Sequence, residues 1–230
     1  MRAEPIASYP HDPSAFTQGL TMYAGRMFEG TGQYGRSSIR EVDLESGEVE
    51  RIASLNRAFF GEGITVLDDR LYQLTWQNGV GAVYSLDSFE VIETFRYEGE
   101  GWGLTHDGES LILSDGTSHI RFLDPEDFSL TQTIEVTGPN GPVERINELE
   151  FIDGQIWANV WYEDVIIRIN PDTGAVEGTI DLSEIYPAEL RGSEEVANGI
   201  AWDARANRIF VTGKNWPQLF EVRLVPVDEP

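Results

Sequence analysis

Two recurring positions in the chain carry most of the residues that could do chemistry. The first position holds amides, a carboxylate and an indole: Gln18, Glu62, Trp102, Asn147 and Asn198. The second position is counted from the residue that follows the first position. It lies 13 residues further on in four cases and 15 in the last, and it holds Gly32, Trp76, Gly116, Trp161 and Lys214. Indole walls with a few converging polar groups are typical of a small-ligand pocket, so we expect the two positions to form one site.

This candidate site contains one acid and one primary amine. Glu62 is the only acidic residue at either position, and Lys214 is the only lysine among the 16 lysine and arginine residues of the chain. A carboxyl surrounded by three tryptophans would be partly desolvated, which raises its pKa and suits it to proton transfer. Lys214, Gln18 and Asn147 could donate hydrogen bonds to an oxygen that becomes negatively charged. Either a salt-adapted surface or a GC-rich genome would explain the scarcity of lysine.

Five repeated segments must bring these residues together. Each consists of an apolar strand, a turn and a second apolar strand: QGLTMYAGRMFEGTG, EGITVLDDRLYQLTW, WGLTHDGESLILSDG, NELEFIDGQIWANVW and NGIAWDARANRIFVTGK. The residues that follow the first position are Gly19, Gly63, Gly103, Glu148 and Gly199, at spacings of 44, 40, 45 and 51. After each of the first four segments, a stretch such as REVDLESGEV adds a strand, a polar turn and the start of another strand.

Four short strands in roughly 45 residues are the signature of a propeller blade. We therefore predict an all-β fold, a five-bladed β-propeller with four antiparallel strands per blade, as a single domain over residues 1–230. The last segment provides only three strands, so the N-terminal EPIASYP should supply the fourth and close the ring, which removes exposed sheet edges. Residues 182–197 are the one irregular stretch, expected to be a loop or short helix. Equivalent positions of different blades face the same surface around the axis.

A glycine motif near the N-terminus invites a different interpretation. Gly30, Gly32 and Gly35 in EGTGQYGRS fit the G-x-G-x-x-G spacing of a dinucleotide-binding loop, which requires a helix after its last glycine. The following SSIREVDLESGEV instead has β-branched residues and a Ser-Gly turn. We therefore predict that GTGQYG connects two strands at the pocket end and that its small residues leave room for the ligand.

Composition and charge exclude several classes of function. The formal net charge of −24 repels nucleic acid and anionic lipid, so we expect neither as a partner. The absence of cysteine excludes disulfides, thiolate zinc sites and a cysteine nucleophile. His11, His106 and His119 lie outside both recurring positions, and we expect structural or surface roles for them.

No segment of the sequence predicts a membrane span or a signal peptide. No apolar run approaches 18 residues, and MRAEPIASYP lacks the apolar region of a leader. We expect a monomer that is exported to the periplasm or the extracellular space, with its leader absent from this chain. A cytoplasmic location is the alternative.

Seven stretches of the chain match one known family in order and with similar spacing: HDPSAFTQGL, FFGEGIT, LTWQN, GEGWGLTHDG, INELEFIDGQIWANVW, NGIAWD and TGKNWPQ. From His11 to Val222 the sequence resembles the plant-type glutaminyl cyclases, or glutaminyl-peptide cyclotransferases, of plants and bacteria. The resemblance implies a five-bladed propeller and an acyltransferase that converts the N-terminal glutamine of peptides or proteins to pyroglutamate and releases ammonia. It also implies that the chemistry needs no metal and no other cofactor, in contrast to the zinc-dependent animal enzymes.

The resemblance further implies roles for nine residues. Glu62 would act as general base and then as general acid, because one proton must leave the attacking amine and another must reach the departing ammonia. Lys214, Gln18 and Asn147 would be the other catalytic residues, and which of the three contacts the carbonyl oxygen of the substrate stays open. The substrate-binding residues would be Phe16, Phe60, Trp76, Trp102 and Trp161.

Two other functions fit parts of the pattern. Glu62, Asn147 and Asn198 are similar to the metal-binding lining of propeller lactonases, and oxygen ligands of this kind suit Ca²⁺. A metal-dependent lactonase would lose its activity when a chelator is added. A non-catalytic propeller would bind peptides or carbohydrate on its tryptophans without release of ammonia.

Overall fold

The computed structural model describes residues 1–227, and their regular structure is almost entirely β-strand. The one exception among these residues is a 3₁₀ turn, η1, at Ala188–Leu190. No helix in this part of the chain is long and apolar enough to cross a membrane. The sequence-based prediction of an all-β fold is confirmed.

Three four-stranded antiparallel sheets follow one another along the first part of the chain. The first sheet contains β2 (Thr17–Tyr23), β3 (Arg26–Thr31), β4 (Ser38–Val42) and β5 (Val49–Ser54). The second contains β6 (Gly61–Leu67), β7 (Arg70–Thr75), β8 (Val80–Ser85) and β9 (Val91–Arg96). The third contains β10 (Leu104–His106), β11 (Leu111–Ser114), β12 (His119–Leu123) and β13 (Leu130–Glu135). A two-stranded ribbon follows, β14 (Thr137–Gly138) and β15 (Gly141–Pro142).

The remaining strands form one eight-stranded sheet in the order β16-β17-β18-β19-β1-β22-β21-β20. These strands are β16 (Ile146–Ile152), β17 (Gln155–Val160), β18 (Val165–Ile169), β19 (Val176–Asp181), β1 (Arg2–Pro10), β22 (Gln218–Val225), β21 (Arg208–Gly213) and β20 (Ala197–Asp203). Strand β1 pairs antiparallel with β22 from Arg2↔Val225 to Pro10↔Gln218, and it meets β19 through the parallel pair Arg2↔Asp181. The N-terminal strand therefore completes the last group of strands, as the sequence predicts.

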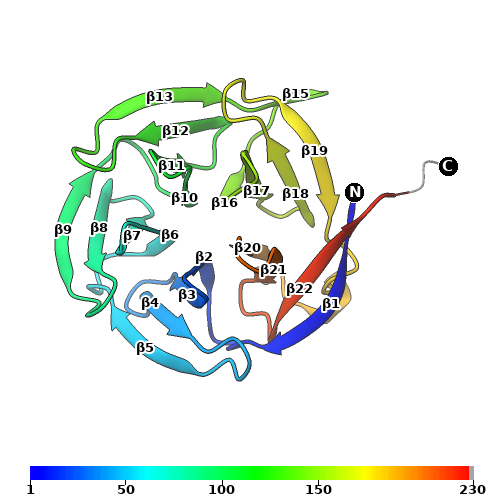
Figure 1. The fold of residues 1–230 in the computed structure, drawn as a ribbon, viewed down its shortest axis with the longest axis horizontal. Coiled ribbons are helices and arrows are strands. Elements are labelled where there is room, and N and C mark those ends of the chain that lie inside the picture. Colours follow the sequence, from blue (N-terminus) through cyan, green and yellow to red (C-terminus); the bar gives the residue numbers. More distant parts are fainter. Residues whose placement is uncertain (228–230) are drawn as a thin grey trace.

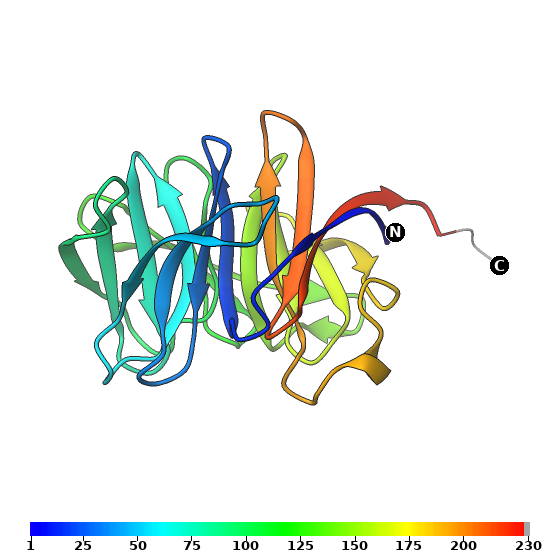
Figure 2. The same ribbon diagram turned by 90° about the horizontal axis from the view of Figure 1, so that it is seen from below.

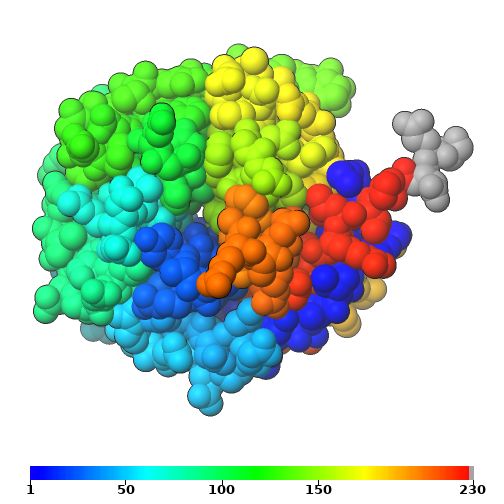
Figure 3. All heavy atoms as spheres, in the orientation of Figure 1, coloured from blue at the N-terminus to red at the C-terminus, as the bar shows by residue number. Residues whose placement is uncertain are grey.

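The sheets stand side by side around a central axis (Figure 1), with β2, β6, β10, β16 and β20 nearest the axis and β5, β9, β13 and β19 at the rim. Figure 2 shows the inner strands running along this axis, with the β2–β3 and β20–β21 hairpin turns gathered at one end of the molecule and further turns at the other end. In the space-filling view of that end, the β2–β3 and β20–β21 hairpins crowd around the centre of the ring (Figure 3).

The apolar core is divided among the interfaces between neighbouring sheets. Phe28 and Ile39 of the first sheet pack with Ile64 and Val66 of the second in one buried cluster. Similar clusters join the second sheet to the third, the third to the β16–β19 strands, these to β20–β22, and β20–β22 back to the first sheet. Because burial of apolar surface drives this packing, the inner strands are held at fixed positions around the axis.

Four inner strands carry a β-bulge at the same place. The register of their pairing shifts between Thr17 and Gly19, Gly61 and Ile64, Ile146 and Leu149, and Ala197 and Ile200. Each shift includes the first recurring position of the sequence. A bulge bends its strand and re-aims a side chain, which releases this position from the regular alternation of a strand.

Glycine directly after the first recurring position allows neighbouring inner strands to approach backbone to backbone. A Cβ atom on Gly63 would lie 2.5 Å from the backbone nitrogen of Leu104 in the next sheet. A Cβ atom on Gly103 would lie 2.0 Å from the carbonyl oxygen of Asn147. The glycine repeat seen in the sequence therefore reflects close contact at the axis.

Buried glutamates on β16 hold the inner strands where the glycine repeat is interrupted. Glu148 occupies the glycine position, and its carboxylate accepts hydrogen bonds from the backbone nitrogens of Leu20 at 3.1 Å and Ile200 at 2.9 Å. Glu150 accepts one from the backbone nitrogen of Trp202 at 3.0 Å. Burial raises the pKa of Glu148 well above its ordinary range and that of Glu150 to about 8. Protonated carboxyls are therefore favoured at this level of the axis.

The irregular stretch 182–197 contains η1 and projects from the end of the molecule opposite the gathered hairpins (Figure 2). The Arg191 guanidinium pairs with the Asp164 carboxylate and lies 5.4 Å from the Trp216 ring. Trp216 also donates from Nε1 to the carbonyl oxygen of Glu195 at 2.8 Å. The predicted loop or short helix is confirmed, and these contacts attach it to the body of the fold.

Candidate active site

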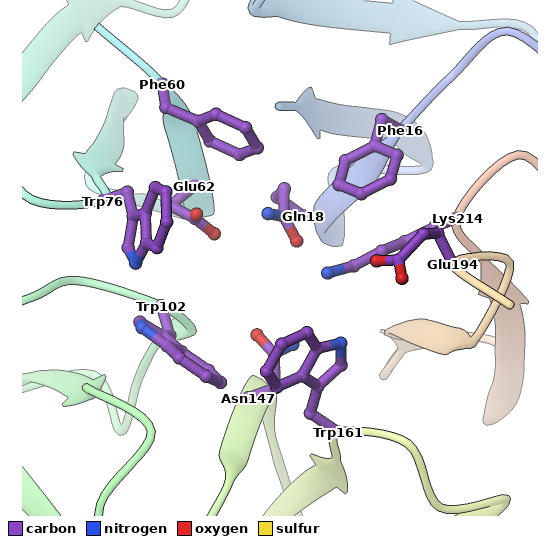
Figure 4. A pocket seen from close by; sticks show the side chains of 10 residues that line it. All are labelled: Phe16, Gln18, Phe60, Glu62, Trp76, Trp102, Asn147, Trp161, Glu194 and Lys214. Atoms are coloured by element: carbon purple, nitrogen blue, oxygen red, sulfur yellow. The ribbon is translucent and has the colours of Figure 1, made fainter. Parts of the chain in front are cut away.

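Ten side chains line a pocket of about 290 Å³ where one end of the inner strands meets the axis (Figure 4). They are Phe16, Gln18, Phe60, Glu62, Trp76, Trp102, Asn147, Trp161, Glu194 and Lys214. The structure thus brings together all nine residues predicted from the sequence, and it adds Glu194. The volume equals that of roughly ten water molecules in the liquid, which suits one polar side chain with its backbone amine.

Strand pairing explains why the two recurring positions meet. Each inner strand starts at the pocket end, and the antiparallel strand beside it returns to the same end. Gly61 pairs with Thr75, and in this antiparallel pair Glu62 and Trp76 follow on opposite sides of it, so both lie close to the pocket end. The backbone nitrogen of Trp76 donates to the carbonyl oxygen of Phe60 at 3.0 Å. The same relation holds for Asn147 and Trp161 on either side of the pair Ile146↔Val160, and for Gln18 and Gly32 on either side of Thr17↔Thr31.

Glu62 and Lys214 are the buried ionisable groups of the pocket, with 4% and 5% of their surfaces exposed. Burial raises the pKa of the Glu62 carboxyl well above its ordinary range, the charge of Lys214 opposes this shift, and the charge of Glu100 adds to it. Burial lowers the pKa of the Lys214 ammonium, and the charges of Glu62 and Glu194 oppose that shift. Each group therefore favours the ionised form of the other, while the dry surroundings favour the neutral forms.

Aromatic rings form the walls of the pocket through edge-to-face contacts. The Phe60 ring lies 6.2 Å from Phe16 and 5.7 Å from Trp76, measured between ring centroids. Trp102 meets Trp161 at 5.3 Å with an interplanar angle of 87°. Such contacts restrain the rings, so the walls have a defined shape before a ligand arrives.

The Lys214 ammonium lies among these rings. Its Nζ is 4.9 Å from the centroid of Phe16 and 5.8 Å from that of Trp161. A cation within about 6 Å of an aromatic face is attracted by the ring quadrupole, which compensates part of the cost of burial. Lys214 is therefore held with its charge inside the pocket.

Two of the three indole N–H groups are already engaged within the protein. Glu100 Oε2 accepts hydrogen bonds from Trp76 Nε1 at 2.7 Å and from Trp102 Nε1 at 2.8 Å. Trp161 Nε1, in contrast, is buried and has no partner. Trp76 and Trp102 present apolar ring surface to the pocket, and Trp161 offers a free donor.

Amide groups at the pocket also leave hydrogen-bonding capacity for a ligand. Asn147 Oδ1 is buried without a partner. Asn198 donates from Nδ2 to the carbonyl oxygen of Thr17 at 2.9 Å and to Gln18 Oε1 at 3.4 Å, which turns the Gln18 amide nitrogen toward the pocket (Figure 4). A buried unpaired polar atom costs free energy, so these atoms are expected to bind a ligand or water.

Asn198 does not itself line the pocket. Glu62, Asn147 and Asn198 therefore do not share one cavity surface, contrary to the lactonase alternative. Within residues 1–227, no group of three or more His, Cys, Asp or Glu side chains is arranged to hold a metal ion.

The two glycines at the second recurring position accommodate wall residues of the pocket. A Cβ atom on Gly32 would lie 2.4 Å from Phe60 Cε1 and 2.9 Å from Gln18 Cγ. One on Gly116 would lie 2.7 Å from Trp102 Cζ2. GTGQYG does connect β3 to β4, but the prediction that its small residues leave room for the ligand was wrong at Gly32, because the Phe60 ring fills that space.

Comparison with known proteins identifies the family. The sequence profile of the glutamine cyclotransferase family, described as "Glutamine cyclotransferase", matches residues 1–224. The chain belongs to this family. It is 44% identical over 227 residues to the glutaminyl-peptide cyclotransferase of Arabidopsis thaliana, covering 96% of this chain and 71% of that protein.

Two solved structures are similar to this chain, one of them a glutaminyl cyclase. The glutaminyl cyclase of Myxococcus xanthus superposes with a TM-score of 0.92 at 41% identity, covering 98% of this chain and 97% of that one. The WD40 β-propeller domain of Doa1 superposes with a TM-score of 0.55 at 13% identity, over 90% of this chain and 63% of that one. The second likeness concerns the fold alone, which is propeller-like.

Two acids at the site of this glutamine cyclotransferase family member were not among the residues predicted from the sequence. Glu194 lines the pocket from the 182–197 stretch and accepts a hydrogen bond from the Tyr162 hydroxyl at 2.8 Å. This stretch has no counterpart in the other repeats, so alignment of the repeats could not reveal it. Glu100 lies outside both recurring positions, and its place two residues before Trp102 in GEGWGL was the only available signal.

The histidines take the structural or surface roles expected of them. His11 is buried, donates from Nδ1 to the carbonyl oxygen of Trp216 at 2.6 Å and bonds through Nε2 to Glu29 at 2.9 Å. His106 accepts from the backbone nitrogen of Gly108 through Nδ1 at 3.0 Å, and His119 is exposed. None of the three lines the pocket.

Proposed function

We propose that this pocket cyclises the N-terminal glutamine of peptides or proteins to pyroglutamate and releases ammonia. The observation that carries the proposal is the buried Glu62 carboxyl with a raised pKa, in a pocket that also holds the only lysine of the chain. Membership of the glutamine cyclotransferase family and the 44% identity to a glutaminyl-peptide cyclotransferase support the same activity.

Glu62 moves the protons of the reaction. The α-amine of the substrate has an ordinary pKa near 8 and is largely protonated at neutral pH, so a carboxylate must take its proton before it can attack. The amine nitrogen then bonds to the side-chain carboxamide carbon of the same glutamine. As the bond from this carbon to the amide nitrogen breaks, Glu62 gives its proton to the departing nitrogen and takes the second proton of the attacking nitrogen, so that ammonia and a neutral lactam result. A raised pKa brings Glu62 close to the pH at which both transfers are efficient.

Lys214 and the amides stabilise the intermediate. Attack places negative charge on the carboxamide oxygen, and fixed donors at that oxygen lower the barrier by a few kcal/mol. The Lys214 ammonium and the Gln18 amide nitrogen both point into the pocket (Figure 4). Asn147 Oδ1 is a free acceptor, which suits the amine or the carboxamide NH₂ of the substrate.

The aromatic walls hold the amine of the substrate close to its own carboxamide. Phe16, Phe60 and the three tryptophans surround a space of about 290 Å³ that is partly open to solvent. A glutamine side chain folded so that its amine meets its own carboxamide fits the enclosure, and this pre-organisation accelerates an intramolecular attack. A γ-carboxylate is a poor electrophile and would be repelled by Glu62, so the site favours glutamine over glutamate.

Five four-stranded blades support this pocket in the architecture that we propose. The three four-stranded sheets supply three blades, and the eight-stranded sheet divides at the single β1–β19 pair into two more. Core clusters at each successive interface support the count, with all residues in one domain.

A monomer and an exported protein remain predictions from the sequence. The net charge of −24 supports a peptide or protein substrate over nucleic acid or a lipid surface.

Ammonia release distinguishes the proposal from its alternatives. The protein is incubated with a Gln-initiated peptide and with the matched Glu-initiated peptide, each with and without a chelator. We expect ammonia and pyroglutamyl peptide from the first peptide only, in equal amounts and independent of the chelator. Binding without ammonia release would support the non-catalytic propeller, and loss of activity with the chelator would support a metal-dependent enzyme.

A further inference from the structure

Glu100 lies outside the pocket lining but is bonded to two of its walls. One oxygen of its carboxylate, Oε2, accepts from the indole nitrogens of Trp76 and Trp102, which belong to different sheets. Its other oxygen, Oε1, accepts from Gln77 Nε2 at 3.0 Å. A single carboxylate therefore connects the second and third sheets directly behind the pocket.

The chain around Glu100 is itself fixed. Arg121 donates from Nη2 to the carbonyl oxygen of Glu100 at 3.0 Å and pairs with Asp115 at 3.3 Å. The backbone nitrogen of Gly101 donates to the carbonyl oxygen of Trp76 at 2.9 Å. The carboxylate is thus held at a defined position rather than on a free loop.

Glu100 is ionised at this position, although its partial burial disfavours the charge. Hydrogen bonds from Trp102, Gln77 and Trp76 outweigh that burial and keep the pKa of Glu100 below its ordinary range. Two charged groups change the pKa of Glu62: the charge of Lys214 lowers it, and the charge of Glu100 raises it.

We propose that Glu100 is a positioning residue for the cyclisation, which clamps Trp76 and Trp102 as apolar walls and helps to hold the shuttle proton on Glu62. The inference rests on the proposed function. By engaging both indole N–H groups, Glu100 leaves Trp161 as the indole that can donate to the substrate. This gives the three tryptophans different tasks.

Two substitutions separate the clamp from the charge. In Glu100→Gln the amide oxygen can still accept from both indoles, but the negative charge is lost. In Glu100→Ala the acceptor is lost as well. The matched control is Glu98→Gln, which removes the same charge from an exposed side chain two residues away. For each variant, kcat and KM for a Gln-initiated peptide are measured from pH 5 to pH 9, with near-ultraviolet circular dichroism as a readout of the tryptophans.

Loss of the Glu100 charge should shift the pH profile of kcat without weakening the binding of the peptide. Because the charge of Glu100 favours the protonated form of Glu62, we expect Glu100→Gln to shift the acid limb of kcat to lower pH by about half a unit or more, with KM within about twofold of wild type. Glu100→Ala should raise KM about tenfold or more and alter the tryptophan circular dichroism signal. Glu98→Gln should change neither parameter.

The inference is overturned if both Glu100 variants keep the wild-type pH profile and KM while only their melting temperature falls. If Glu100→Ala does not fold, Glu100→Gln alone decides, since an unmoved acid limb contradicts the role of the charge. Failure of the proposed function would look different, because the wild-type protein itself would release no ammonia. In that case an unchanged tryptophan circular dichroism signal in Glu100→Ala would still contradict the clamp.

Discussion

Glu62 and Lys214 come from different sheets and point toward each other into one pocket (Figure 4). Their mutual effect is opposed by burial: the pKa of Glu62 is raised and that of Lys214 is lowered, and each charge reduces the shift of the other. Burial and the mutual effect of the two charges therefore act in opposite directions on each group. The roles of Glu62 and Lys214 can therefore be tested separately by substitution.

Glu62→Gln should abolish most of the turnover. A glutamine cannot accept the amine proton, so we expect kcat to fall about 10²-fold or more with a smaller change in KM. Steady-state ammonia release checks this. Glu150→Gln is the matched control, since it replaces another buried glutamate outside the pocket and should leave kcat within about threefold. Turnover of Glu62→Gln at that control level would remove Glu62 from the proton transfer.

Lys214→Met should lower kcat by about 10²-fold, because the charge opposite the developing oxyanion is lost while the aliphatic stem is kept. The residual activity should also shift its acid limb to higher pH, since the charge of Lys214 lowers the pKa of Glu62. This shift is opposite to the one expected for Glu100→Gln. Arg145→Met removes an exposed cation instead and should leave both parameters unchanged. An acid limb that moves downward in Lys214→Met would contradict the coupling.

Trp161→Phe should weaken substrate binding without loss of stability. The Trp161 Nε1 group is buried and unpartnered, so its removal costs the folded protein no hydrogen bond. If this group donates to the substrate, KM should rise about tenfold, the value of one hydrogen bond. Trp157→Phe is the control, because its indole nitrogen is likewise buried and unpartnered but lies in the core between sheets. Equal KM values for the two variants would show that the Trp161 donor does not face the substrate.

Internal repetition made most of the site predictable from the sequence. Strand pairs such as Gly61↔Thr75 return to the same end of the fold in successive sheets, so aligned residues converge even when they are far apart in the chain. Phe16 and Phe60 lie outside the two aligned positions, and only the family resemblance indicated them. Glu194 lies in a stretch that the other repeats lack, and no alignment of repeats could place it at the pocket.

Contacts that depend on side-chain direction could not be predicted. The clamp by Glu100 requires two indoles to turn their N–H groups toward one oxygen, and sequence spacing does not specify this. The role of Glu148 depends on the close approach of three inner strands, which lets one carboxylate reach the backbone of two neighbours. Gly32 was placed at the correct end of the fold, but the residue that occupies its space comes from another sheet.

The stability of the protein should fall as the pH rises, in part because of Glu150. Its pKa is about 8 in the folded protein, above the ordinary value, so its contribution to stability is fully present below about pH 4 and is lost as the pH rises through 8. We expect Glu150→Gln to melt roughly 5 °C or more above wild type at pH 9 and to lose this advantage near pH 5. The exposed control Glu109→Gln should follow wild type at both values. A constant difference at both pH values would show that titration of Glu150 is not involved.

Gly32→Ala should impair the pocket by displacing Phe60, a side chain that is distant from Gly32 in the sequence. The new Cβ would lie 2.4 Å from Phe60 Cε1, so the ring must move, and it forms edge contacts with both Phe16 and Trp76. We expect KM to rise roughly 3- to 10-fold with a smaller change in kcat, since proximity is affected more than proton transfer.

A matched pair of variants tests whether Phe60 carries the effect of Gly32→Ala. Gly192→Ala is the control, because its Cβ would lie 3.6 Å from the nearest atom and KM should not change. Phe60→Leu should raise KM by itself, but it also removes the ring atoms that collide with the new Cβ. The double variant should therefore be no worse than Phe60→Leu alone. Additive effects of the two substitutions would show that Gly32 acts on the pocket by another route.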